Sequence, residues 1–247
     1  AASGRRKFRP GRAEESTVMG RFFRLKNNLA SLYAMVQLGR KPGAVRYVFI
    51  MGDRQDNLAE VDRLAGRITD PFSDADLDHL WRDQYRPPHY EVADLAKLPE
   101  QTLGGAYGRF MLAHGLQPDF YENVAPRHKM HFLRLRLRQT HDIWHVLSGF
   151  GTDEFGEVGL QGLYFAQVTN GQSALILTGA ILKSIIHGRF QDLKLFIASF
   201  CEGFSMGQKS RNLLGVLWET HWRDDLASLR RASGIQAVGC VSIPLET

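Results

Sequence analysis

The chain has few cysteines, no long hydrophobic run and no excess of charge outside its first residues. Two cysteines among 247 residues, Cys201 and Cys240, cannot form a disulfide framework, so we expect a reducing compartment. The longest apolar stretch, 174–182, is too short to cross a bilayer, and the sequence therefore predicts no membrane-spanning helix. What remains, 44% hydrophobic and 23% charged residues, is the composition of a globular protein with a sizeable core.

The formal net charge of +5 is confined to one end of the chain. The first twelve residues contain no acid and five bases: Arg5, Arg6, Lys7, Arg9 and Arg12. Without those five, the 31 basic residues fall to 26, equal to the 26 acidic residues. We therefore expect residues 1–19 to be a disordered basic tail that can touch an anionic membrane surface, and we expect no nucleic-acid partner.

Helical periodicity and capping residues predict an all-α fold, with one mainly helical domain at 20–247. Only 45–52 and the last few residues have β character. Ser73 and Thr152 are the expected N-caps of two of the helices, and Gly115 and Gly149 end two others. The helical segments expected are 27–42, 56–70, 73–85, 99–115, 127–149, 152–167, 173–190, 193–214 and 216–234.

A pair of histidines within RQTHDIWHVLSGFGTDEFGE is the first candidate for chemistry. His141 and His145 are four positions apart, so on a helix they differ by only about 40° around the axis and can reach one metal ion. Asp142 lies about 100° from His141, and it can join the ion or orient a histidine. Two histidines at this spacing also occur by chance in core helices, and spacing alone leaves that reading open.

Glu157 gives the histidine pair a third partner. Its neighbours at i+3 and i+7 are Leu160 and Tyr164, so Glu157 belongs to an apolar stripe, where an isolated carboxylate is costly unless a cation pairs with it. The SGFG break lets the second helix fold back beside the first. Asp153 and Glu154, by contrast, are explained by the positive end of a helix dipole.

The pattern His141-Asp142-x-x-His145, eleven residues, then Glu157 resembles the coenzyme Q biosynthesis protein 4 family. LPEQTLGGAYGRFMLAHGLQPD, RLRQTHD and WRDDLASLRRASGI are also similar to segments of that family, and the similarity covers about residues 20–235. The resemblance implies an all-α protein with an apolar lipid-binding cavity. It also implies a divalent ion, zinc first and iron, manganese or magnesium next, held by His141, Asp142, His145 and Glu157.

The resemblance further implies a role in ubiquinone biosynthesis, as a metal-dependent enzyme for oxidative decarboxylation at ring carbon C1 of a polyprenylated quinone precursor. The expected partners are that precursor, the membrane surface and other ubiquinone-biosynthesis enzymes, and we also expect a homo-oligomer. The expected location is peripheral, on the cytoplasmic side of a bacterial inner membrane or the matrix side of the mitochondrial inner membrane.

Several roles stay open at this point. Asp142 can be a ligand, a catalytic proton acceptor or the ion-pair partner of Arg138, and Arg138 can instead bind a substrate carboxylate. Tyr164 is expected to contact the substrate, in a groove that takes the prenyl tail. The apolar run at 175–186 and the stripe Phe196, Phe200 and Phe204 can line that groove or be plain core. ILKSIIHGRF (181–190) suits a helix end at a membrane surface.

Two further functions compete with the metal enzyme. The first is a non-catalytic scaffold that presents lipid to other ubiquinone-biosynthesis enzymes, with a structural metal. The second is a metal phosphohydrolase, a class that also carries adjacent His-Asp but needs another histidine upstream and an aspartate downstream. His89, His114 and Asp192 are available for that arrangement, and nothing in the sequence selects them.

Overall fold

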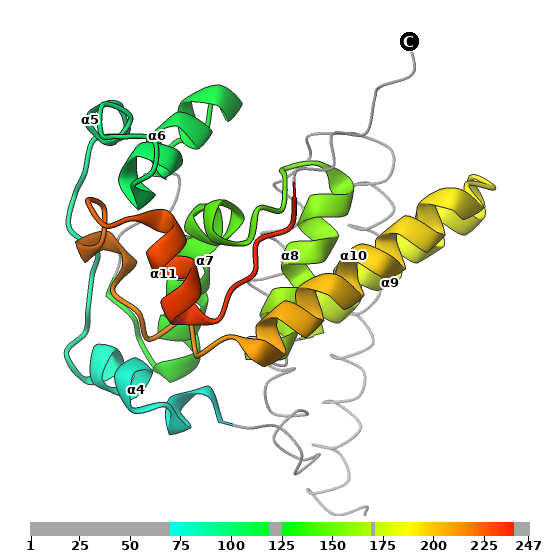
Figure 1. Ribbon diagram of the computed structural model, residues 1–247. Helices are drawn as coiled ribbons and strands as arrows, with labels where there is room; N and C mark the ends of the chain where they lie inside the picture. The colour runs from blue at the N-terminus through cyan, green and yellow to red at the C-terminus, as the bar shows by residue number, and fades with distance from the viewer. Residues whose placement is uncertain (1–69, 119–124, 169–170, 240–247) are drawn as a thin grey trace, which may run out of the picture. The chain divides into compact units, whose positions relative to one another are not determined.

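The computed structural model describes residues 70–118, 125–168 and 171–239, which all fall in one compact unit of the chain (Figure 1). Across these ranges the regular structure consists of eight α-helices and two 3-10 helices with no strand, which confirms the predicted all-α fold. The elements are η2 (Pro71–Ser73), α4 (Ala75–Arg82), α5 (Val92–Leu95), α6 (Leu103–His114), α7 (Lys129–Ser148), α8 (Glu154–Gln167), α9 (Gly171–Ile186), α10 (Phe190–Lys209), η4 (Trp218–Thr220) and α11 (Leu226–Ser233).

The first part of the chain lies outside the described residues. The basic tail at 1–19, the helix at 27–42, the β-like segment at 45–52 and all but the last residue of the helix at 56–70 belong to it. The domain division at residue 19 therefore stays a prediction.

Two predicted N-caps are wrong by one residue. Asp74, and not Ser73, caps α4, where its Oδ1 accepts a hydrogen bond from Leu77 N at 2.9 Å. Asp153, and not Thr152, caps α8. In both cases the following aspartate carries a charged acceptor, which suits the exposed N–H groups and the positive end of the helix dipole better than a hydroxyl does.

The C-terminal helix predicted at 216–234 is interrupted. Trp218–Thr220 form a short 3-10 turn, and α11 starts only at Leu226, after the Asp225 side chain accepts a hydrogen bond from Ser228 N. The turn is tied to the core because the Trp218 indole donates to Leu213 O at 2.9 Å. The need to bury this segment against α7 therefore overrides helical periodicity.

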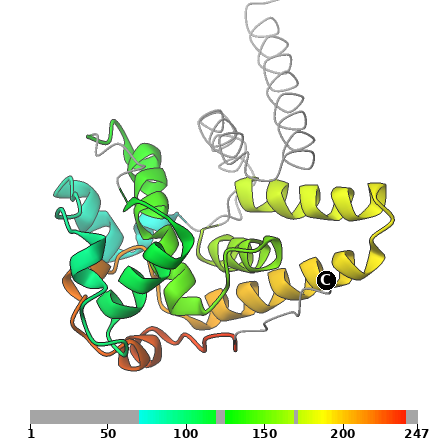
Figure 2. The ribbon, with the colours of Figure 1, turned by 90° about the horizontal axis from the view of Figure 1, so that it is seen from above.

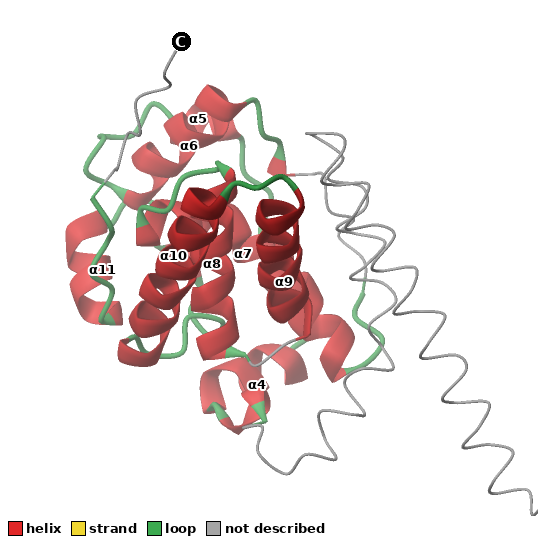
Figure 3. Cartoon of the chain, turned by 90° about the vertical axis from the view of Figure 1, so that its right-hand side faces the viewer, coloured by secondary structure: helices red, strands yellow, loops and turns green. Residues whose placement is uncertain are grey.

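Helices α8, α9 and α10 each pack against the other two (Figures 2 and 3). Glycines let α8 and α10 approach backbone to backbone: a Cβ on Gly203 would lie 1.8 Å from Gly159 O, and one on Gly162 would lie 2.1 Å from Phe200 O. Gly188, with φ of 66°, turns the chain from α9 into α10, so the predicted continuation of α9 to residue 190 is wrong. The close contact between α8 and α10 fixes the position of α8, the helix that carries Glu157.

Helix α7 is held at its middle and at its end by the C-terminal part of the chain. The buried guanidinium of Arg136 pairs with Glu219 and also donates to Leu214 O and Val216 O. Near the end of α7, Arg230 donates to Leu147 O at 2.9 Å and to Val146 O at 2.8 Å. A cation is favoured there because the last carbonyls of a helix carry partial negative charge.

None of the helices in the described ranges has the length and apolar character that crossing a membrane requires.

Candidate metal centre

The glycine-rich break after α7 places Glu157 opposite the histidines. Gly149 ends α7 in the left-handed region with φ of 80°. Gly156 then passes so close to the loop that a Cβ there would lie 2.1 Å from Gly151 O. Glu157 follows in the first turn of α8, and the predicted fold-back of this helix beside the histidines is confirmed.

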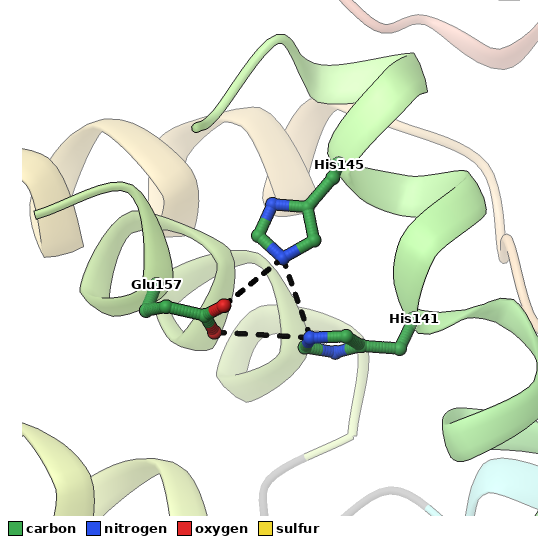
Figure 4. Close-up of side chains that lie close together, drawn as sticks. All are labelled: His141, His145 and Glu157. Carbon is green, nitrogen blue, oxygen red and sulfur yellow. Dashed lines mark hydrogen bonds and ion pairs between the residues drawn. The ribbon is translucent and has the colours of Figure 1, made fainter. Parts of the chain in front are cut away.

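Three side chains converge on one point (Figure 4). The Nε2 atoms of His141 and His145 are 3.3 Å apart. Glu157 Oε1 lies 3.3 Å from His145 Nε2, and its Oε2 lies 3.8 Å from His141 Nε2. The side chain of His145 is 1% exposed, whereas His141 is 24% and Glu157 38% exposed, so the point of convergence is closed on one side and open on the other.

Both histidines are held through their other ring nitrogen. His145 Nδ1 is 3.0 Å from Phe150 O, and because a carbonyl only accepts, Nδ1 carries a hydrogen; in the neutral imidazole, Nε2 then presents its lone pair. His141 Nδ1 is 3.0 Å from the Tyr164 hydroxyl, which donates to Leu137 O at 3.4 Å and can therefore accept from His141. Such contacts fix the tautomer of histidines that bind metals.

The charges of the three residues are strongly coupled. Burial raises the pKa of Glu157. The hydrogen bonds and charges of His141 and His145 lower this pKa by more than burial raises it, so that it lies far below its ordinary value. Burial lowers the pKa of His141, whereas Glu157 raises it through hydrogen bonding and charge, and the net pKa lies above 6.5. Without a metal ion, the site therefore favours a protonated His141 beside an ionised Glu157.

The donor set fits a divalent metal ion. In tetrahedral coordination at about 2.0–2.1 Å, two ligand atoms are about 3.3–3.4 Å apart. The separation of 3.3 Å between the two Nε2 atoms, and of Glu157 Oε1 from His145 Nε2, matches this distance. Two imidazoles and one carboxylate leave a coordination position open and suit zinc, iron or manganese.

Asp142 does not join this cluster. The three residues whose ligand atoms converge in the described part of the chain are His141, His145 and Glu157. Asp142 is half-buried, and burial raises the pKa of its carboxyl, which the charges of His141 and His145 oppose. The structure thus gives no support to Asp142 as a direct ligand, whereas a role beside the ion stays a prediction.

Asp142 and Arg138 line the same cavity of about 100 Å³ on the neighbouring face of α7. Tyr107 of α6, Tyr90 and Glu219 also line it. The predicted i,i+4 ion pair between Arg138 and Asp142 is not formed in the described structure. Both side chains therefore face a small polar cavity, and the predicted contact of Arg138 with a substrate carboxylate stays a prediction. This cavity is distinct in size and polarity from the apolar lipid-binding cavity that we predicted.

Tyr164 contacts the candidate metal centre through His141. Its hydroxyl contacts His141 Nδ1 at 3.0 Å, and its ring stacks on Trp144 with centroids 4.6 Å apart. The residue is only 5% exposed. The position explains how Tyr164 can orient His141, and the predicted substrate contact of Tyr164 stays untested.

The phosphohydrolase arrangement finds no support among the described side chains. His89 is paired with Glu91 at an exposed position, and Asp192 is paired with Arg189. Among the described residues, His114 forms no hydrogen bond with His141 or His145. Its Nδ1 contacts Phe110 O within its own helix. The cluster thus lacks the extra histidine and aspartate that this class requires.

Sequence reasoning missed two contributors to the site. Phe150 acts through its main-chain carbonyl, which no side-chain pattern signals. Phe110 of α6 stacks on His145 with centroids 5.7 Å apart, and its apolar position in the 99–115 segment marks it only as a core residue. Tertiary packing brings Phe110 to His145, whereas the loop after α7 places the Phe150 carbonyl.

The geometry defines a class: an all-α protein in which two histidines of one helix and a glutamate of the next form a candidate divalent-metal site. A family model described as coenzyme Q (ubiquinone) biosynthesis protein Coq4 matches residues 82–239, more than half of the chain. The chain belongs to this family, and the family predicted from the sequence is confirmed.

Individual relatives agree with this assignment. The mitochondrial ubiquinone biosynthesis protein coq4 of Talaromyces stipitatus is 30% identical over 146 residues, 58% of this chain and 49% of that protein. The mitochondrial COQ4 homologue of Aedes aegypti is 28% identical over 146 residues, 58% of this chain and 52% of that protein. The chain thus spans about half the length of these relatives.

The fold also matches a solved structure. The crystal structure of a Nostoc punctiforme protein provisionally assigned to ubiquinone biosynthesis has a TM-score of 0.69 and 28% identity with this chain. The match covers 85% of this chain and 99% of the Nostoc chain. The helical architecture is therefore shared well beyond the segment that carries the histidines.

Proposed function

We propose that the protein is a metal-dependent enzyme of ubiquinone biosynthesis that carries out oxidative decarboxylation at ring carbon C1 of a polyprenylated precursor. The observation that carries this proposal is the convergence of His141, His145 and Glu157, two of them on helix α7, whose residues Arg138 and Asp142 line a separate small cavity. Membership of the Coq4 family supports the pathway, and the site geometry supports the metal dependence.

The residues have separate tasks in this proposal. His141, His145 and Glu157 would hold a divalent ion, which supplies Lewis-acid stabilisation of negative charge on the ring and carboxyl oxygens. Arg138 binds the substrate carboxylate, because a guanidinium matches carboxylate geometry. Asp142 accepts the proton of a ring hydroxyl, since its carboxylate lines the same cavity as Arg138. The partly exposed side of the centre gives the substrate access.

We also propose a peripheral position on a membrane, where the prenylated precursor resides. Of the seven large hydrophobic residues that are exposed in the described ranges, six lie between residues 182 and 197, around the turn from α9 to α10. Lys183, His187, Arg189 and Lys194 lie among them. Apolar side chains with basic neighbours are typical of segments that rest in a lipid interface. The Aedes aegypti and Talaromyces stipitatus relatives are named as mitochondrial, and the location that we propose is the matrix side of the inner membrane.

The test is turnover by the purified full-length chain. A carboxylated, prenylated precursor is incubated with oxygen and protein loaded with zinc, iron or manganese, and the ring product is identified by mass spectrometry. We expect loss of the C1 carboxyl with gain of a hydroxyl, and iron to outperform zinc because zinc has no redox chemistry. The His141→Ala variant should lose turnover, whereas His79→Ala, which changes an exposed histidine of α4, should not. Undiminished turnover by an ion-free His141→Ala variant would contradict a catalytic metal.

A scaffold is the second candidate function, and the exposed apolar surface at 182–197 favours it, because such a surface can also hold a partner protein. In that case the ion would only brace α7 against α8. Capture of other ubiquinone-biosynthesis enzymes by a chain that shows no turnover with any of the three metals would establish the scaffold in place of the enzyme.

A further inference from the structure

The turn at the end of α7 carries the carbonyl that holds His145. His145 Nδ1 lies 3.0 Å from Phe150 O. Because a hydrogen bond is lost once its two heavy atoms move more than about 3.5 Å apart, a small shift of the turn would release the imidazole. The groups that fix residues 146–150 therefore also determine how His145 is held.

A buried hydroxyl links the two sides of this turn. Ser148 is fully buried, and its Oγ donates to Trp144 O at 2.6 Å. The same oxygen accepts from Phe150 N at 3.3 Å, because a hydroxyl keeps its lone pairs when it donates. Ser148 thus ties Phe150 to the last turn of α7, from which His145 also projects.

The C-terminal part of the chain holds the same turn from another side. Arg230 of α11 donates to Leu147 O at 2.9 Å and to Val146 O at 2.8 Å. Val238 N donates to Ser148 O at 2.8 Å. A planar guanidinium that binds two successive carbonyls fixes both their positions and their directions. The carbonyls of three successive residues at the end of α7 are therefore held by residues that are distant in the sequence.

We propose that Ser148 and Arg230 are positioning residues of the candidate metal centre, which act on His145 through the Phe150 carbonyl. Ser148 sets the distance of that carbonyl from Nδ1, and Arg230 keeps the turn in place against α11. In the neutral imidazole, the hydrogen then stays on Nδ1 and the lone pair on Nε2, where Glu157 Oε1 lies 3.3 Å away. This assignment rests on the proposed function, because it concerns a histidine that would bind the ion.

The test follows the His145 side chain and the zinc affinity of full-length variants together. Proton–nitrogen correlation spectra of histidine-labelled protein detect the ring hydrogen on Nδ1, which exchanges slowly while a buried acceptor holds it. The signal of His145 is assigned by its absence from His145→Ala. Ser148→Ala and Arg230→Gln should each remove or broaden this signal. Each should also weaken zinc binding by about threefold to tenfold, less than the loss of a direct partner of the histidine.

Each variant has a matched control. Ser184→Ala, on α9, also deletes a buried hydroxyl that donates to a carbonyl of its own helix, Ala180 O at 2.9 Å. Arg231→Gln removes an exposed guanidinium of α11, which donates to Ser228 Oγ at 2.8 Å. Both controls should keep the wild-type signal and zinc affinity. Arg230→Lys keeps the charge but loses the planar fork of donors, so its zinc affinity should fall between those of Arg230→Gln and the wild type.

The melting temperature separates positioning from folding. Ser148→Ala and Ser184→Ala should both lower it, because each removes a buried hydrogen bond, but only Ser148→Ala should change His145. An unchanged His145 signal in Ser148→Ala or in Arg230→Gln would overturn the role of that residue, even if zinc binding weakened. Equal losses in a variant and its matched control would overturn it as well. If Arg230→Gln did not fold, Arg230→Lys would decide the role of Arg230.

The failure of this proposal is distinguishable from that of the proposed function. The Nδ1 signal can be followed in zinc-free protein, so it decides both roles even for a chain that binds no zinc, a result that would contradict the metal centre alone. A wild-type chain that binds zinc and turns over, with an unchanged His145 signal in both variants, would contradict the positioning roles alone.

Discussion

At the residue scale, the candidate metal centre depends on atoms outside His141, His145 and Glu157. The Phe150 carbonyl fixes the tautomer of His145, and Tyr164 holds His141 from the far side of its ring. Trp144 stacks on Tyr164 and keeps that ring in place. The direction of both lone pairs is thus set by packing between α7, α8 and the loop that joins them.

Removal of the Tyr164 hydroxyl should weaken metal binding without unfolding the protein. Tyr164→Phe keeps the stack on Trp144 but deletes the contact with His141 Nδ1. Loss of such a partner typically lowers metal affinity by about tenfold or more. Competition with a zinc chelator measures the change, and Tyr85→Phe serves as the hydroxyl-deletion control. An affinity equal to that of the wild type in Tyr164→Phe would show that His141 needs no such support.

Metal binding should strengthen as the pH rises through the pKa of His141. The Glu157 carboxylate raises that pKa above 6.5, so in the ion-free protein the protonated pair adds stability that is fully present below 6.5 and is lost as the pH rises through the raised pKa. A metal ion needs the deprotonated imidazole, and its stabilising effect follows the opposite trend. The difference in melting temperature between zinc-loaded and zinc-free protein should therefore grow from about pH 5.5 to about pH 8. A constant difference would exclude His141 as a ligand.

The three converging residues could be predicted from the sequence, and their surroundings could not. Spacing identified His141 and His145, and an apolar stripe identified Glu157, because helical geometry alone determines those relations. Asp142 was predicted to join them because it is adjacent to His141, yet a neighbour rotated by about 100° lines a cavity that none of the three lines. The hydroxyl of Tyr107 comes from another helix, and no local pattern links it to α7.

At the scale of elements, the contact between α8 and α10 is the tightest in the described structure. Gly203 of α10 faces Gly159 of α8, and Gly162 of α8 faces the backbone of Phe200, with almost no room for a side chain at either place. Glu157 lies just before this contact on the same helix. The position of the carboxylate therefore depends on how closely the two helices approach.

Gly203→Ala should destabilise the protein and weaken metal binding together. The added methyl group would lie 1.8 Å from Gly159 O, and the helices must separate to accept it. Overpacking of this kind costs about 1–3 kcal/mol, which lowers the melting temperature by several degrees. Gly239→Ala, where a Cβ meets open space, is the control. A stable Gly203→Ala variant with normal zinc affinity would show that this contact does not position Glu157.

The sequence predicts which segments are helical better than it predicts where each helix ends. The bounds predicted for α7 and α8 lie within two residues of those in the structure. The end of α7 was predictable because Gly149 can adopt the left-handed conformation that stops a helix. The prediction of one continuous helix at 216–234 was wrong because the burial of Trp218 and Glu219 against α7 interrupts it. Such long-range demands are absent from a local pattern.

At the scale of the whole molecule, the exposed apolar surface at 182–197 is the feature that a purely aqueous role leaves unexplained. Ile186 is 66% and Phe190 64% exposed, on either side of the turn at Gly188. Lys183 and Arg189 are engaged with Glu154 and Asp192, so the apolar side chains dominate the tip of this helical hairpin.

Charged residues at this tip should release the protein from membranes. Burial of a large apolar side chain contributes about 1.5–3 kcal/mol, so the double variant Ile186→Glu, Phe190→Glu should bind anionic vesicles at least about tenfold more weakly. Sedimentation with vesicles of phosphatidylcholine and cardiolipin measures binding. Leu112→Glu, at a 57% exposed apolar position of α6, should bind as the wild type does. Equal losses in both variants, or none in either, would contradict a lipid contact at 182–197.

The most direct test of the metal centre is the metal content of the full chain. After incubation with zinc, iron or manganese and removal of excess ion, elemental analysis of the wild type should give about one ion per chain. His145→Ala and Glu157→Ala should each reduce this to near background, whereas the exposed-histidine variant His79→Ala should match the wild type. A wild-type chain that retains none of the three metals would contradict a metal centre at His141, His145 and Glu157. His145→Ala and Glu157→Ala variants that retain as much metal as the wild type would contradict it as well.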